Sequence, residues 1–146
     1  MRYLGLLWAV LVGMGLTVQV GMNATASRAL KSPLWASVAS FVIGLCALAV
    51  VAALTQAVPP RASFSGAPVW AWFGGALGAA YVASTIVLGP MLGATSMSAL
   101  VVAGQLAAAL IVDHFGLLGF PEQSVTIARL TGAALLVAGA ALVVRP

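Results

Sequence analysis

The sequence predicts an all-α, polytopic integral membrane protein with five transmembrane helices. The first reason is composition: 63% of the 146 residues are hydrophobic and 5% are charged, whereas a soluble domain carries roughly 25% charged residues. The second is a mean hydropathy of +1.17. The third is that apolar runs of about 20 residues, the length that crosses a bilayer, recur along the chain. We therefore expect residues 1–146 to form a single five-span membrane domain.

Each expected span is an apolar segment bounded by polar or helix-breaking residues. In chain order, we expect spans at Tyr3 to Met22, Pro33 to Ala57, Val69 to Leu88, Met91 to Val112 and Val125 to Val144. The separators are NATASRALKS, VPPRASFSGAP, Gly89-Pro90 and DHFGLLGFPEQS. VPPRASFSGAP is the clearest break, because paired prolines and a glycine do not continue a helix. Gly89 and Pro90 are expected to form a tight step between the third and fourth spans and to serve as a hinge there.

The first apolar segment has a second interpretation. Arg2, an apolar core and Ala24-Thr25-Ala26 are also typical of a secretory signal peptide with its cleavage site. However, the segment exceeds the roughly 7–15 apolar residues of such a signal, and Gln19 interrupts its end. We therefore interpret it as a span, and the intact mass of the purified protein distinguishes the two.

The positive charges are balanced across the predicted membrane, because five spans place the termini on opposite sides. One side carries Arg2, Arg61 and, if its side chain reaches the preceding loop, Arg129; the other carries Arg28, Lys31 and Arg145. An excess of Lys and Arg on the cytoplasmic side sets the orientation of a membrane protein. Equal numbers on the two sides therefore favour neither orientation. We expect both orientations to occur and to pair as an antiparallel homodimer. The alternative is that one charge, such as Arg2, fixes a single orientation.

Polar side chains inside the spans indicate which helix faces turn away from lipid. Trp8 and Gln19 share a narrow sector of the first span, and Asn23 follows one turn later. Ser98 and Gln105 are seven residues apart and share a face of the fourth. Small residues at such positions usually mark close packing, but buried amides need hydrogen-bond partners. We therefore expect a substrate cavity lined by Trp8, Gln19, Asn23, Tyr81, Ser98 and Gln105.

Asp113 and His114 stand at the end of the fourth span. A helix from Met91 to Asp113 rises about 33 Å, close to the hydrocarbon thickness, so we expect Asp113 at the membrane interface. Two roles are open. Asp113 ends the span and pairs with Arg129 across the loop, or Asp113 and His114 form a proton-responsive gate, since histidine titrates near neutral pH. Glu122, the other acid, is expected to be solvated in its loop.

Few residues offer chemistry for catalysis or for a cofactor. The single cysteine, Cys46, lies in an apolar run and is expected to be a small buried hydrophobe. One histidine and two acids form neither a nucleophile–base pair nor a metal-ligand spacing. The six basic residues are scattered and form no stripe for nucleic acid. We therefore expect no enzyme, no metal, no cofactor and no nucleic-acid partner.

Several residue combinations are typical of one family of membrane proteins. They are Gln19/Asn23, Trp72/Gly74/Gly75, Gly104/Gln105 and Asp113/His114/Phe115/Gly116. They stand in the runs VQVGMNATASRALKSPLWASVASFVIGLCAL, PVWAWFGGALGAAYV, GPMLGATSMSALVVAGQLAAALIVDHFGLLGFP and RLTGAALLVAGAAL. With these runs, nearly the whole chain resembles the YdcZ-like family of the drug/metabolite transporter (DMT) superfamily.

The resemblance implies a multi-pass protein of the bacterial inner (cytoplasmic) membrane that exports small molecules. It also implies a five-helix unit equivalent to one half of an EamA-like ten-helix inverted-repeat transporter, pairing with a second unit. Small multidrug-resistance relatives use an acidic residue of the first helix for proton and cation exchange. In this sequence, that helix offers Gln19 and Asn23 and has no Asp or Glu, which argues against antiport by that mechanism.

We therefore expect a transporter that works by alternating access as an antiparallel, dual-topology homodimer. Its partners would be membrane lipid and a small cationic or amphipathic substrate, which the aromatic rings attract through cation–π contact. The alternative is a non-transporting accessory protein or flippase subunit that binds a partner protein through the same polar helix faces.

Overall fold

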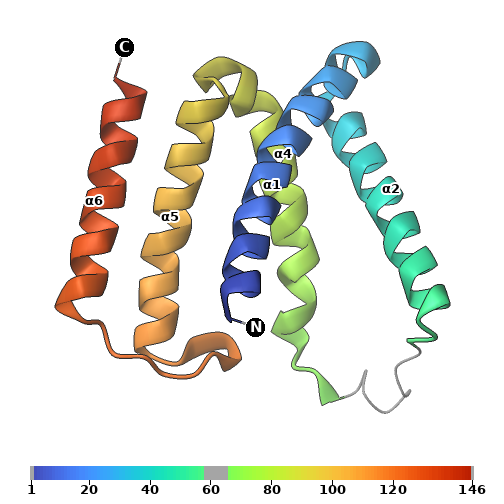
Figure 1. Ribbon diagram of the computed structural model, residues 1–146. Helices are drawn as coiled ribbons and strands as arrows, with labels where there is room; N and C mark the ends of the chain where they lie inside the picture. Colours follow the sequence, from blue (N-terminus) through green and yellow to red (C-terminus); the bar gives the residue numbers. More distant parts are fainter. Residues whose placement is uncertain (1, 58–65, 146) are drawn as a thin grey trace. The chain divides into compact units, whose positions relative to one another are not determined.

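The computed structural model describes residues 2–57 and 66–145, and these residues form helices connected by turns and loops without any strand (Figure 1). Five helical segments within this part of the chain are long and apolar enough to cross a membrane. The predicted all-α, polytopic fold is confirmed. Residues 58–65, which include Arg61 and most of the predicted break at VPPRASFSGAP, lie outside the described residues, as does the side chain of Arg2. The elements are α1 (Arg2–Leu30), α2 (Pro33–Leu54), η1 (Val69–Phe73), α4 (Gly74–Leu92), α5 (Ala94–His114), η2 (Leu117–Gly119) and α6 (Ile127–Val144).

The first helix is longer than predicted, because α1 continues through the separator NATASRAL to Leu30. The polar side chains there are satisfied on the helix itself. The Thr25 hydroxyl donates to the carbonyl of Gly21 at 3.0 Å, and the Arg28 guanidinium donates to the Thr25 hydroxyl at 2.9 Å. Helix α1 therefore continues past the predicted end of the first span at Met22, since polarity alone does not end a helix whose side chains find partners in the preceding turn.

The turn from α1 to α2 takes only two residues. Lys31 adopts a left-handed conformation with φ +51°, and Ser32 caps α2 by accepting a hydrogen bond from the Trp35 N–H at 3.3 Å. Pro33 occupies the first position of α2, where its missing N–H has no intrahelical acceptor to lose. This short turn makes α1 and α2 neighbouring antiparallel helices (Figure 1).

The first compact unit, Met1–Met91, contains α1, α2 and α4 up to residue 91. Its buried core consists of Ala36 from α2 with Val82 and Ile86 from α4, against which Ala26 and Tyr81 pack. The core is small because the helices meet through alanine and β-branched side chains. Thr85 is also buried, and its hydroxyl donates to the Val82 carbonyl at 2.9 Å.

The predicted step at Gly89-Pro90 is wrong, because both residues lie inside α4, which ends at Leu92. The chain turns instead at Gly93, whose φ of +80° suits glycine. Pro90 has no N–H to donate to the carbonyl four residues earlier, but membrane helices tolerate such a loss. Gly89 is buried, and a Cβ added there would stand 2.8 Å from Cγ1 of Val20 in α1. Glycine is thus required for contact between the helices.

The second compact unit, Leu92–Pro146, is a hairpin of α5 and α6, which lie side by side and antiparallel (Figure 1). Its connection reverses direction through Gly116, Leu118 and Gly119, all with positive φ. The Asp113 carbonyl, in the last turn of α5, accepts hydrogen bonds from the Gly116 N–H at 3.4 Å and from the Gln123 N–H at 2.7 Å. These bonds hold the connection against the end of α5. The single five-span domain stays a prediction.

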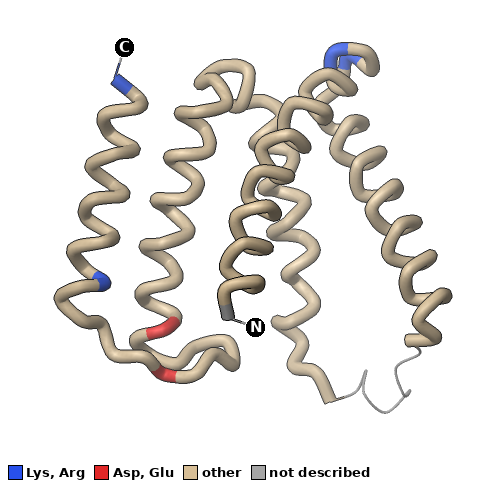
Figure 2. Tube along the Cα trace, viewed as in Figure 1, with Lys and Arg blue, Asp and Glu red and all other residues tan. Residues whose placement is uncertain are grey.

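Both units present apolar surfaces. In the most apolar stretch of the first spanning helix no residue is buried, and in that of the third 22% of the residues are buried. Side chains such as Leu7, Ile43, Leu77 and Leu135 are more than half exposed. The described charges lie instead near helix ends or in a loop (Figure 2). Cys46 is exposed, so the expectation that it is buried is wrong. Surfaces of this kind are stable in lipid.

Candidate functional site

The polar face predicted for α1 is divided by packing. Trp8 is 68% exposed and Gln19 is exposed, whereas Asn23 is only 8% exposed. The side of α1 that packs on its own unit runs through Val20, which contacts Gly89, and through buried Ala24. Since Asn23 is about one turn beyond Val20, it is buried with them.

The candidates from the third and fourth spans also differ in surroundings. Tyr81 of α4 is partly buried and packs against the core of the first unit. Ser98 of α5 is partly buried and lines a shallow groove of about 250 Å³ beside α6. Gln105, two turns further along α5, is exposed. Trp8, Gln19, Asn23 and Tyr81 thus belong to the first unit and Ser98 and Gln105 to the second.

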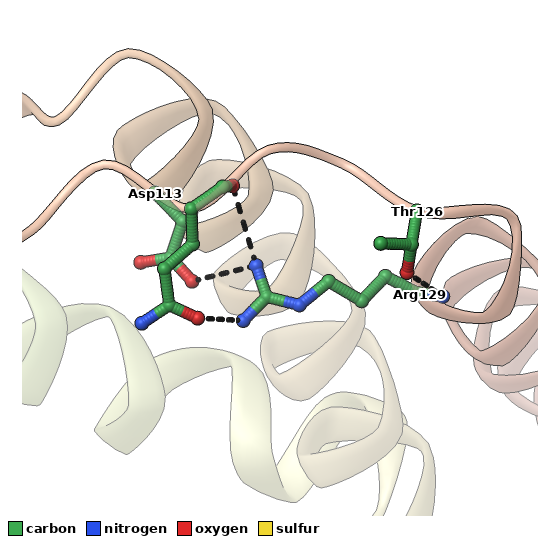
Figure 3. Close-up of polar contacts among 4 residues, drawn as sticks. Asp113, Thr126 and Arg129 are labelled. Carbon is green, nitrogen blue, oxygen red and sulfur yellow. Dashed lines mark hydrogen bonds and ion pairs between the residues drawn. The ribbon is translucent and has the colours of Figure 1, made fainter.

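An ion pair joins the end of α5 to the start of α6 (Figure 3). Nη1 of Arg129 lies 3.3 Å from Oδ2 of Asp113, with the two side chains 35% and 26% exposed. The pairing of Asp113 with Arg129, expected as one of two roles, is confirmed as a contact. Because the Arg129 side chain reaches the loop, the condition on which the balance of positive charges depended is met.

Gln123 joins this ion pair, although its sequence position gave no sign of it. The Arg129 guanidinium donates from Nη1 to the Gln123 carbonyl at 3.5 Å and from Nη2 to Oε1 of the Gln123 side chain. The Thr126 hydroxyl caps α6 by accepting the Arg129 N–H at 3.3 Å, which fixes the base of the arginine (Figure 3). We call Asp113, Gln123 and Arg129 the loop clamp.

His114 is not part of the loop clamp. Its side chain is exposed, and its ring meets the Phe115 ring edge to face with centroids 4.7 Å apart. Asp113 and His114 are adjacent in sequence but contact different groups, because successive helical side chains point about 100° apart. A joint proton-responsive gate stays a prediction. No three His, Cys, Asp or Glu side chains come together to hold a metal ion within the described ranges.

A groove of about 340 Å³ runs between α5 and α6 and ends at the ion pair. Small side chains keep it open, because α6 contributes Gly132 and Ala133 where a larger residue would fill the space. A Cβ added to Gly132 would meet no atom within 4 Å. The complete lining is Leu106, Ala109, Leu110, Asp113, Arg129, Gly132 and Ala133.

Residues 4–142 match a family model described as "Putative inner membrane exporter, YdcZ". The five spanning helices, which carry few internal charges, agree with this match. The chain belongs to the YdcZ family. The resemblance inferred from the sequence is confirmed, and this YdcZ chain is a multi-pass protein of the inner membrane. Comparison of the YdcZ chain with curated proteins and with solved structures gives no match.

Proposed function

We propose that the chain exports small cationic or amphipathic molecules by alternating access, as an antiparallel homodimer. The observation that carries the proposal is that neither unit covers its own glutamine. Gln19 on α1 and Gln105 on α5 are exposed although both lie within spanning helices. Hydrocarbon offers no partner for an amide. A polar cavity shared with a second copy would supply these partners and admit a substrate.

Two further side chains support a binding surface on α1. Asn23 is only 8% exposed, and its amide lies about one turn from Gln19 on the same helix. Trp8 is exposed about three turns from Gln19 on the same side of the helix. An indole face attracts a desolvated cation by up to about 2 kcal/mol. The pairing of amides with an indole therefore favours a substrate that has both a cationic and an apolar part.

The antiparallel pairing rests on the charges. Arg28 and Lys31 lie near the α1–α2 turn, and Arg129 reaches the loop before α6. With Arg2, Arg61 and Arg145 added from the sequence, the two sides remain equal. Two copies in opposite orientations would form an inverted repeat, the arrangement that transporters use for alternating access. Gly89 and Pro90 within α4 would be the hinge, since the missing Pro90 N–H weakens the helix there.

The test is substrate flux in proteoliposomes. Gln19→Ala and Gln105→Ala should each reduce flux roughly tenfold, the effect of losing a hydrogen bond of about 1.4 kcal/mol. Val18→Ala, at an exposed apolar position next to Gln19, is the control and should not change flux. Unchanged flux in both glutamine variants would remove the amides from the mechanism.

Orientation is tested separately with reporters at each terminus that are active on one side of the membrane only. Activity of both reporters at both termini supports dual insertion, and activity at a single location contradicts it. Stable co-purification with another membrane protein, without flux by the chain alone, would favour the accessory role instead.

A further inference from the structure

The groove between α5 and α6 joins an apolar channel to a pair of opposite charges. Its apolar part runs along α5 from Leu106 to Leu110, and Asp113 and Arg129 stand at its end. Asp113 is in the last turn of α5, a helix of 21 residues, which spans about 30 Å. The charges therefore lie at the depth of lipid headgroups while the groove extends toward the acyl chains.

The loop clamp leaves unused hydrogen-bonding groups of both signs. Arg129 binds its neighbours through Nη1 and Nη2, and its Nε–H has no acceptor among the described residues. Asp113 pairs through Oδ2, so Oδ1 can accept further hydrogen bonds. Both side chains are about one quarter to one third exposed. These contacts use three of the five N–H groups of the guanidinium, so a ligand at this point meets unused donors of a cation and an unused acceptor oxygen of an anion.

We propose that this groove binds one zwitterionic phospholipid whose headgroup carries a primary ammonium. The phosphate accepts from Arg129, the ammonium donates to Asp113, and an acyl chain lies along Leu106 and Leu110 over Gly132. The site is distinct from the glutamines of the proposed export path and does not depend on export.

Charge complementarity selects this occupant over others. The ion pair is neutral overall, so an anionic headgroup would gain from Arg129 but would meet the Asp113 carboxylate. A quaternary ammonium has no N–H to donate to Oδ1. A second copy of the chain would have to bring an apolar helix against a partly exposed ion pair, leaving the unused N–H groups of Arg129 and Oδ1 of Asp113 without hydrogen-bond partners.

The experiment is native mass spectrometry of the full-length protein. Detergent-solubilised protein is given an equimolar mixture of phosphatidylethanolamine, phosphatidylcholine and phosphatidylglycerol. The wild-type protein should retain one phosphatidylethanolamine, favoured roughly tenfold over each of the others, as expected for a charge-assisted hydrogen bond of about 1.5 kcal/mol. This measurement needs no variant. Equal retention of the three lipids, or preference for either competitor, would overturn the proposal.

Two variants then locate the site. Gly132→Leu fills the groove without displacing neighbours at Cβ and should abolish retention, while Gly139→Leu, equally open but outside the groove, should not. Asp113→Asn should remove the preference for the primary ammonium over phosphatidylcholine. Retention that survives Gly132→Leu contradicts the site, and so does loss of a dimer in that variant with lipid still bound.

Discussion

The two compact units are held together in different ways. In the first unit, α1, α2 and α4 meet through small and apolar side chains, and Gly89 leaves no room for a methyl group beside Val20. In the second, α5 and α6 are joined at one end by the loop clamp, and Gly132 faces open space. The same residue type thus permits close contact in one unit and keeps a groove open in the other.

The difference shows what each unit can tolerate. Closely packed helices leave no free space between them, so an added methyl group must displace a neighbouring side chain. In the second unit, α5 and α6 lie side by side, but a groove remains between them next to the hydrogen-bonded end. We therefore expect the first unit to be sensitive to side-chain size and the second to be sensitive to polarity. Two predictions test this directly, and two more compare the turns and an exposed face of α2.

The largest effect is expected from matched glycine substitutions. Gly89→Ala should lower the free energy of unfolding by about 1–3 kcal/mol through overpacking against Val20, whereas Gly132→Ala should leave it unchanged or raise it by up to about 1 kcal/mol. Thermal or denaturant unfolding in detergent, followed by tryptophan fluorescence, measures both. Adding Val20→Ala should restore much of the loss in Gly89→Ala. Equal effects at the two glycines would remove the proposed distinction.

The next effect concerns polarity. Arg129→Gln removes the ion pair and the bonds to Gln123, and should lower the free energy of unfolding by about 1–2 kcal/mol, since the groups are partly solvated. Arg28→Gln in the first unit removes one exposed hydrogen bond to Thr25 and should change it by less than about 0.5 kcal/mol. The same unfolding measurements compare the two. A larger loss in Arg28→Gln would contradict the assignment of polar contacts to the second unit.

The third prediction compares one turn from each unit, and the expected changes in the free energy of unfolding have opposite signs. Gly116 has φ +60°, and a Cβ added there would stand 3.3 Å from Cβ of Glu122. Gly116→Ala should therefore lower the free energy of unfolding by about 1 kcal/mol. Lys31 has φ +51° without being glycine, so Lys31→Gly should stabilise by up to about 1 kcal/mol. Shifts in the unfolding midpoint give both signs. Gly104→Ala, within α5, is the control for the loss of a glycine.

The smallest effect is expected at Cys46, which is exposed on α2. Cys46→Ala should change the free energy of unfolding by less than about 0.5 kcal/mol, because no packed contact is lost. It also yields a protein without cysteine, into which single cysteines can be placed for labelling. A loss of more than about 1 kcal/mol, outside the range of surface substitutions, would show that this face of α2 is packed in the membrane.

The sequence predicted the existence of the spanning helices well and their ends poorly. The apolar runs predicted the five spanning helices, because length and hydropathy alone decide whether a segment can cross a bilayer. At two places a helix continues past the predicted end of a span. The polar residues after Met22 continue α1, since Thr25 and Arg28 find partners on the helix, and Pro90 lies within α4.

The candidate site shows the same division. The pairing of Asp113 with Arg129 was expected because both close the same loop, but Gln123 was not, since only the backbone reversal at Gly116 brings it back to the end of α5. Likewise, periodicity placed Gln19 and Asn23 on one face. The contact of Val20 with Gly89 decides that Asn23 is buried while Gln19 is not.

By itself, the sequence determined the solvent, the number of spans and the family, because these depend on composition and on residue order within single helices. The tertiary structure decided which glycine has a neighbouring side chain against it, that Asn23 rather than Gln19 is buried, and that Gln123 of the loop binds Arg129. These depend on the rotation and approach of one helix against another, which hydrophobic periodicity in a uniformly apolar helix does not specify.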